Sequence, residues 1–362
     1  MEDNVEIVKV DRKNIDRFLS LSKEIYKNNP FYRDTLTRAA RGILRGEGEI
    51  CKSSFIEGVM VIKEDEVLAG CIFSIVDRMD DILQIAYFEA KEGYEQSINI
   101  LLDYGKALAR QKGIKHMLAG LNLHVNYGLG YLASHFDTIQ SLGSAYNPPY
   151  YIDYFQKVAK EEINLTSYIA DMKDISIDID TRPKKRILKN YTVRKADFKD
   201  IEKEAKLYTE INNDAFKSHR FYYERRKEED LELFKEYKLF LKEENLLFLE
   251  HKGKEVGFML WYPDFNQLIK EGETLGVKSL LKSRLFPRKI DTFKIVELGV
   301  ALKHQRTGGV YALFDYCKGI TKERFKKCES GWILDENISS KGFGIRWGKD
   351  EYKKYKVFLL DV

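Results

Sequence analysis

The strongest constraint on the fold is that the chain repeats itself. VEIVKVDRKNIDRFLSLSKEIYKNN, starting at Val5, matches YTVRKADFKDIEKEAKLYTEINN, starting at Tyr191, in its short β-type run and in the helical spacing that follows. Aligning Ile15 with Ile201 sets the offset at 186 positions, from 15 to 201. Two strand–turn–strand patterns further on place Gly70 opposite Gly257, an offset of 187. One architecture is therefore expected twice along the chain.

The offset changes once, and the change indicates an insertion. LDYGKALARQKG, residues 102–113, matches FDYCKGITKERF, residues 314–325, with Tyr104 opposite Tyr316 at an offset of 212. The second copy should thus carry about 25 additional residues, which we place in the segment 265–293.

Each copy predicts the order strand, helix, helix, strand, strand, strand, helix, strand, helix, strand. This order combines an antiparallel hairpin with one βαβ crossover, so the fold class is α/β with a mixed sheet. A length of 362 residues suits two domains. We predict an N-terminal domain over 1–178, a polar linker over 179–190 and a C-terminal domain over 191–362.

Charge and hydropathy exclude several classes of protein. A net charge of +4, spread along the chain, does not favour a nucleic-acid partner. The start, MEDNVEIVKVDRKNID, lacks the features of a signal peptide, and no run reaches the roughly 18 apolar residues of a membrane helix. Histidines and cysteines show no paired metal-ligand spacing. The sequence predicts a cytoplasmic protein with no metal and no membrane partner.

HQRTGGVYALFDY, residues 304–316, joins an apolar run to a segment with helical spacing. The first N–H groups of such a helix are unpaired and can bind phosphate. Gly308 and Gly309 leave the backbone bare, Thr307 can donate a hydroxyl, and Arg306 adds charge. The alternative is a tight turn only. The place directly after a strand of the βαβ unit favours a phosphate site, although the spacing fits neither a P-loop nor a dinucleotide-binding fingerprint.

The predicted strand order and the run QRTGGVYAL together resemble the acyl-CoA pyrophosphate loop of the GNAT (GCN5-related N-acetyltransferase) superfamily, whose pattern is Q/R-x-x-G-x-G/A. Arg306, Gly309 and Tyr311 occupy the pattern, so the final small residue is missing. The pieces YKNNPFYRDTL, YNPPYY, WYPDFNQLIK and SGWILDEN are also similar to a group of uncharacterised bacterial GNAT-like proteins.

The resemblance implies two tandem GNAT-like acyl-CoA N-acyltransferase domains with acetyl-CoA or another acyl-CoA as cofactor. The cofactor-binding residues that it implies are Leu298, Gly299, Val300, Ala301, Leu302, Arg306, Thr307, Gly308, Gly309, Val310, Tyr311 and Asn337. In the first copy, the offset of 212 places Tyr94, Gln96 and Ser97 opposite Arg306, Gly308 and Gly309. One cofactor site per chain is expected, in the second copy.

The candidate catalytic base is Glu297, a carboxylate in an otherwise apolar strand, although a partner across the sheet would explain it equally well. Asp264 and Asn266 follow a hairpin strand and are the candidate substrate-binding residues. In the first copy, a rigid aromatic turn is formed by Asn147, Pro148 and Pro149 with Tyr150 and Tyr151, and further polar candidates are Asn122 and Asn126; a turn or a cap is an equal explanation for each.

The sequence thus predicts an enzyme that transfers an acyl group from acyl-CoA to an amine of a small-molecule or peptide acceptor, as a monomer or homodimer. Two alternatives stay open. One is a catalytically inactive CoA-binding or regulatory protein, and the other is an aminoacyl transferase of the tandem-GNAT type.

Overall fold

A computed structural model describes residues 5–176, 181–348 and 350–362. The predicted domain boundary at 178–179 lies outside the described residues. The first copy contains β1 (Val5–Lys9), α1 (Ile15–Ile25), α2 (Thr37–Leu44), β2 (Ser54–Lys63), β3 (Glu66–Val76), β4 (Met79–Ala90), α3 (Glu95–Gln111), β5 (His116–Ala119), β6 (Tyr131–Leu132), α4 (Tyr150–Val158) and β7 (Glu161–Asp171).

The second copy repeats this order. It contains β8 (Tyr191–Lys195), α6 (Ile201–Ala215), α7 (Lys227–Tyr237), β9 (Leu246–His251), β10 (Lys254–Pro263), α8 (Val277–Leu285), β11 (Thr292–Val300), α9 (Gly309–Thr321), β12 (Lys327–Ser330), β13 (Ile333–Leu334), α10 (Ile338–Gly348) and β14 (Asp350–Asp361). The predicted order of elements is confirmed, with the short strands β6 and β13 added. Helix α8 lies in the predicted insertion.

The predicted linker contains helix α5 (Thr181–Asn190). This helix packs on α9 and β8, and Lys184 pairs with Asp315 of α9 at 3.4 Å. The first copy has an insertion of its own. Residues 120–149 separate β5 from α4 in the first copy, whereas only residues 331–337 separate the corresponding β12 and α10 in the second.

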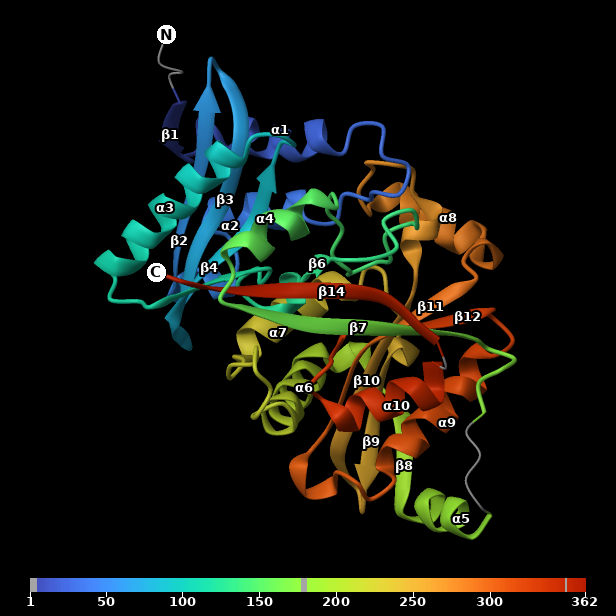
Figure 1. Ribbon diagram of the computed structural model, residues 1–362. Helices are drawn as coiled ribbons and strands as arrows, with labels where there is room; N and C mark the ends of the chain where they lie inside the picture. The colour runs from blue at the N-terminus through green and yellow to red at the C-terminus, as the bar shows by residue number, and fades with distance from the viewer. Residues whose placement is uncertain (1–4, 177–180, 349) are drawn as a thin grey trace.

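All the main strands form one mixed sheet in which the copies exchange their last strands. The order is β1-β2-β3-β4-β5-β14-β7-β12-β11-β10-β9-β8. Strand β14, from the end of the chain, pairs with β5 of the first copy, and β7 of the first copy pairs with β12 of the second. Figure 1 shows β7 and β14 side by side across the middle of the molecule, where they pair antiparallel. The first half of the sheet (β1–β5 with α1–α4) and the second half (β8–β12 with α6–α10) are therefore joined by both exchanged strands.

Helices cover both faces of the sheet. In β3, Ile72 belongs to the apolar cluster under α1, and its neighbour Phe73 belongs to the cluster under α3, as the alternation of side chains along a strand requires. Helix α1 contributes Ile15, Phe18 and Leu19, at helical spacing, to its cluster. Among the helices of the described ranges, none has the length and apolar character needed to cross a bilayer.

Both halves of the sheet have an opening at the same place. The parallel ladder between β4 and β5 ends at Ile85 and Ala119, while β4 continues to Ala90. The ladder between β11 and β12 ends at Ile295 and Ser330, while β11 continues to Val300. The carboxyl ends of parallel strands are where ligands of α/β proteins usually bind.

Candidate functional site

A cavity of about 350 Å³ lies at the opening of the first half and reaches to the second. Its lining includes Tyr87, Phe88 and Glu89 at the end of β4, and Gly120 after β5. The second half contributes α7 and the end of β10, through Tyr237 and Tyr262. Mainly apolar lining with few polar groups is typical of a site for a small organic ligand.

Glu89 is the carboxylate of this cavity. Its side chain accepts hydrogen bonds from the hydroxyls of Tyr151, at 2.6 Å, and Tyr26, at 3.1 Å. Burial raises the pKa of Glu89 to about 8, even though both hydroxyls favour the ionised form. A carboxyl group whose pKa lies near neutral pH can exchange a proton with a ligand.

Tyrosine rings surround this carboxylate. Tyr26 stacks on Tyr32 with ring centroids 3.8 Å apart, and Tyr146 meets both rings at about 6 Å. Burial raises the pKa of Tyr26 and of Tyr32, so that both hydroxyls are protonated at neutral pH. Aromatic faces beside a carboxylate form an environment that favours an amine or ammonium group.

Tyr87 is a further polar group at the cavity. It adopts a positive φ of 49°, unusual for a residue with a side chain, at an irregularity in the pairing of β3 with β4. The amide oxygen of Asn122 accepts the N–H of Tyr87 at 2.8 Å and supports this conformation. The buried hydroxyl of Tyr87 has no hydrogen-bond partner within the described residues. Such a group can be satisfied by a ligand.

The raised pKa of Glu89 predicts a pH-dependent stability. Between about pH 4.5 and pH 8 the folded protein keeps a proton that the unfolded chain has released, so the free energy of unfolding should fall by up to about 1.4 kcal/mol per pH unit through this group. Glu89→Gln removes this dependence. The melting temperature of Glu89→Gln minus that of the wild type should therefore be larger at pH 8 than at pH 5. Glu92→Gln, at an exposed position, is the control, and a difference that does not vary with pH would contradict the assignment.

The predicted cofactor loop lies at the other half of the molecule, as expected for the second copy. Leu298, Gly299 and Val300 are in β11 beyond its ladder with β12, and Ala301 and Leu302 follow that strand. Val310 and Tyr311 are in the first turn of α9. Arg306 is exposed and has a positive φ of 61°, a conformation that is often found at functional sites.

The two glycines of this loop also have packing reasons. Gly308 has a φ of 92°, and a Cβ there would meet Ile187 of α5 at 2.6 Å. A Cβ at Gly309 would meet Leu249 at the same distance. Thr307 hydrogen-bonds the hydroxyl of Tyr191 at 2.6 Å. The loop thus combines a phosphate-compatible helix start with a tight turn against α5.

In the first half, tyrosines of α4 occupy the corresponding backbone groups. The N–H of Ala90 donates to Tyr151 Oη at 2.8 Å, and the Ala90 carbonyl accepts from Tyr150 Oη at 2.9 Å. The N–H of Gly93 donates to Tyr154 Oη at 3.3 Å. These backbone groups of the first half are therefore paired within the protein. In the second half the N–H of Leu302 is also paired, with Asp214 at 2.8 Å, and a single cofactor site in the second copy stays a prediction.

Glu297 has strong partners of its own. Its carboxylate accepts from Tyr208 and from Asn212, the latter at 2.6 Å, and lies 3.6 Å from Arg225 Nη1. Arg225 also pairs with Asp230, and both side chains are almost fully buried. Glu297 is thus part of a buried charge network, and its role as a base stays a prediction.

A small cavity lies beside this network. It has about 20 Å³, is lined by Arg225 and Asp230, and shares Asn126, Tyr127 and Leu233 with the main cavity.

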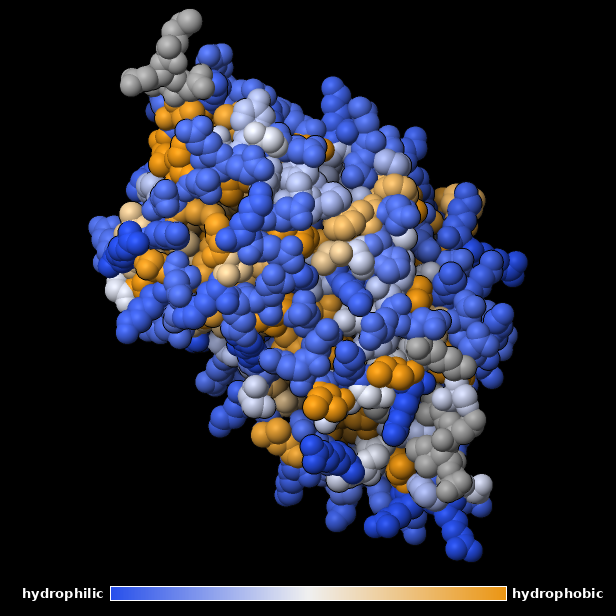
Figure 2. Space-filling view, in the orientation of Figure 1, coloured by the Kyte–Doolittle hydropathy of each residue, from blue (hydrophilic) through white to orange (hydrophobic). Residues whose placement is uncertain are grey.

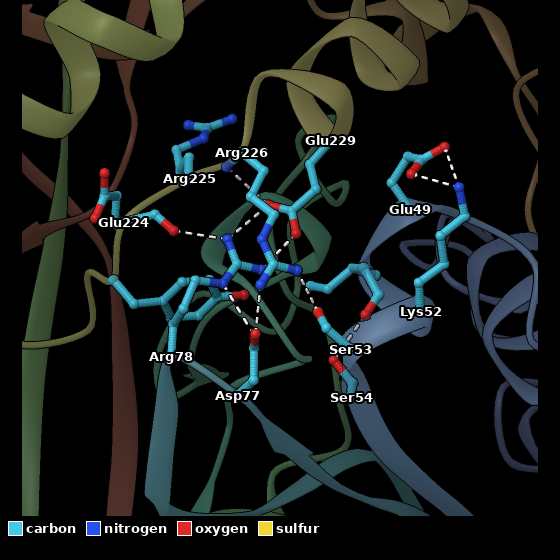
Figure 3. A network of polar contacts seen from close by, with 12 residues as sticks. Glu49, Lys52, Ser53, Ser54, Asp77, Arg78, Glu224, Arg225, Arg226 and Glu229 are labelled. Carbon is cyan, nitrogen blue, oxygen red and sulfur yellow. Dashed lines mark hydrogen bonds and ion pairs between the residues drawn. The ribbon is translucent and has the colours of Figure 1, made fainter.

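Ion pairs beside the network hold the two halves together. Arg78 at the end of β3 pairs with Glu229 of α7, and Arg226 pairs with Asp77. In Figure 3 these pairs converge, whereas the side chain of Arg225 turns away from them toward its own partners.

Asp264 and Asn266 lie at the contact between the halves. Asp264 accepts from the N–H of Leu142 at 2.9 Å, and Asn266 donates to the carbonyl of Gln140 at 2.8 Å. Burial raises the pKa of Asp264 to about 6. Asn337 accepts from the N–H of Ser340 at 3.1 Å and thus caps α10. All three side chains have structural partners, so a contact with substrate or cofactor stays a prediction.

The described residues that line the main cavity include neither the predicted cofactor residues nor Glu297, Asp264 or Asn266. Of the first-copy candidates, they include Asn122, Asn126, Asn147 and Tyr151, but not Pro148, Pro149 or Tyr150. Glu89 was missed. The signal that selected Glu297, a single carboxylate in an apolar strand, is also present in ILQIAYFEA, residues 82–90, and could have found it.

Comparisons with known proteins agree with the architecture. No family model matches the chain. A bacterial ceramide synthase of Caulobacter vibrioides is 25% identical over 272 residues, covering 72% of this chain and 70% of that protein.

Among solved structures, a tandem GNAT protein from the clavulanic acid biosynthesis pathway superposes with a TM-score of 0.56 at 10% identity, covering 99% of this chain and 98% of its own. A GCN5-related N-acetyltransferase from Sphaerobacter thermophilus gives 0.53 at 11% identity, covering 100% and 96%. At these identities the likeness concerns architecture, and it extends over both copies. The chain therefore has the tandem fold of the GNAT N-acetyltransferase superfamily.

Proposed function

We propose that the protein is an acyl-CoA-dependent N-acyltransferase whose acceptor is an amine carrying a long apolar chain. The observation that carries the proposal is the apolar cavity with Glu89 at the end of β4, in a GNAT fold. Fold alone would leave the acceptor open, because one fold serves many substrates.

The cavity has a polar part that suits the amine group of such an acceptor and an apolar part that suits its chain. Glu89 and the rings of Tyr26, Tyr32 and Tyr146 would hold the amine, and the remaining lining would hold the chain. The name of the Caulobacter relative supports this choice, since a ceramide is the amide of a long-chain amine.

The reaction needs a neutral amine. Glu89, when ionised, takes one proton from the bound ammonium group, and its raised pKa makes the protonated carboxyl stable enough to do so. The amine nitrogen then forms a bond to the thioester carbon, the carbon–sulfur bond breaks, and the thiolate of CoA leaves. The second amine proton is released as the amide forms, and the thiolate takes up a proton.

The acyl donor is assigned to the second copy. Main-chain groups of Leu298 to Leu302 would hold its pantetheine arm, and the start of α9 with Arg306 would hold its phosphates.

Arg306→Ala should weaken the binding of CoA about tenfold, because a charge-assisted contact to phosphate is lost. Isothermal titration calorimetry with CoA measures the effect. The control is Lys322→Ala, an exposed cation at the opposite end of α9. Equal affinity of the two variants would remove Arg306 from the cofactor site.

A series of primary alkylamines of increasing length tests the function itself, with acyl-CoA as donor and release of free thiol as the readout. The value of kcat/KM should rise by up to about fourfold per added methylene until the cavity is filled. Equal rates with short polar amines would contradict the apolar acceptor. Binding of CoA without turnover on any amine would favour the non-catalytic alternative.

A further inference from the structure

Helix α8, in the insertion of the second copy, exposes a row of apolar side chains. Val277, Leu281, Leu285 and Phe286 are 74%, 53%, 70% and 50% exposed. The first three are spaced by four residues and lie on one side of the helix. Single exposed apolar residues are ordinary, but three in a row on one short helix, with Phe286 directly after it, mark an interaction surface.

The same segment is strongly basic. Residues 277–289, VKSLLKSRLFPRK, contain five Lys and Arg and no Asp or Glu. Arg284, Arg288 and Lys289 are exposed beside the apolar row. On the face drawn in Figure 2, apolar side chains interrupt the hydrophilic surface on the right, where Figure 1 places α8. An apolar row flanked by cations is typical of helices that lie in the interface of an anionic bilayer.

The segment just before this helix lies at a second opening beside the site. Glu271, Gly272 and Glu273 line a second cavity, of about 320 Å³, which shares Ser22, Tyr26, Tyr32 and Asp34 with the main cavity. The backbone ties the segment to the first copy, because the N–H of Asp34 donates to Glu273 at 3.2 Å and that of Gly272 donates to Tyr32 at 3.1 Å. Helix α8 begins a few residues later, at Val277.

We infer that the exposed face of α8 docks the protein onto a bilayer that contains anionic phospholipid. The apolar row enters the interface, and the cations meet the lipid phosphates. Docking places the opening of the cavity at the membrane surface, from which an amine with a long apolar chain can enter without crossing water. The inference rests on the proposed function only for the entry of the amine from the membrane. Attachment to the membrane surface requires no spanning helix.

Flotation with vesicles of phosphatidylglycerol and phosphatidylcholine tests the docking, with vesicles of phosphatidylcholine alone for comparison. The wild type should float with the anionic vesicles and lose binding as salt is raised. Leu281→Ser with Leu285→Ser, and separately Arg284→Gln with Arg288→Gln, should each lower the partition coefficient about tenfold or more.

Matched controls are Ile338→Ser on α10, which is 82% exposed, and Lys185→Gln with Arg186→Gln on α5. Both should bind vesicles as the wild type does. A wild type that does not float, or controls that lose binding equally, would overturn the inference. A second result would also overturn it. If the wild type does not bind vesicles but forms a concentration-dependent dimer, and the Leu281→Ser, Leu285→Ser double variant is a monomer, the face joins two copies of the chain.

Transfer to a short, water-soluble alkylamine without vesicles separates this inference from the proposed function. The α8 variants should retain that activity. If the wild type transfers the acyl group but does not bind vesicles, the docking alone is overturned. If it binds vesicles but does not transfer the acyl group, the function alone is overturned.

Discussion

Replacing Glu89 by glutamine should lower the turnover of an apolar amine by about 100-fold or more, which is the usual contribution of a positioned general base. Glutamine keeps the shape and can still accept a hydrogen bond from Tyr151 or Tyr26, but it cannot take a proton. In the wild type, kcat/KM should rise with pH until Glu89 is ionised, near pH 8, and this rise should be absent in the variant. Steady-state kinetics between pH 6 and pH 9 measure both effects.

Glu297→Gln provides the comparison, because Glu297 is a carboxylate of β11, the strand of the second half that corresponds to β4, and its partners are Tyr208, Asn212 and Arg225. We expect it to retain more activity than Glu89→Gln. If Glu297→Gln loses the activity while Glu89→Gln retains it, the base is in the second copy and the assignment of the cavity as the amine site is wrong.

Asp230→Asn should destabilise the protein by about 3 kcal/mol, because it removes the partner of a buried cation. The side chains of Arg225 and Asp230 are only 2% and 1% exposed. Without the Asp230 charge, Arg225 has Glu297 at 3.6 Å as its remaining carboxylate partner. Asparagine has nearly the same volume as aspartate, so the loss of stability comes from the missing charge and not from a cavity. Urea unfolding followed by circular dichroism measures it.

The control is Asp77→Asn, which removes the partly exposed carboxylate that pairs with Arg226 of the other half and with the neighbouring Arg78. Its cost should be about 0–1 kcal/mol, as is usual for solvent-exposed pairs. Equal effects of the two substitutions would show that the buried network contributes no more than a surface ion pair.

The repeat made the order of elements and the place of the insertion predictable, because helical and strand periodicities are local and occur twice. The exchange of β7 and β14 was not predictable in this way. Strands pair through backbone groups that nearly every residue carries, so which neighbour each strand meets depends on contacts between residues far apart in the chain. The linker was judged from its polar composition, which does not exclude the helix α5.

The candidate site was predictable only where a motif could be seen. Gly308 and Gly309 marked the start of α9, yet their contacts with Ile187 and Leu249 arise from tertiary packing and could not be inferred. The main cavity is formed by side chains from both copies, so no local pattern describes it. Glu89 stands out once its environment is known, because burial and two tyrosine hydroxyls act on one carboxyl group.

The exchanged strands also bear on how such a chain can be inherited. A gene that encoded the first copy alone would supply β7 without β12 or β14, and one that encoded the second alone would supply β14 without β5 or β7. Each product would present unpaired strand edges, which favour aggregation. Selection then acts on the fused pair as a single unit, and the loops of the two copies are free to diverge from each other.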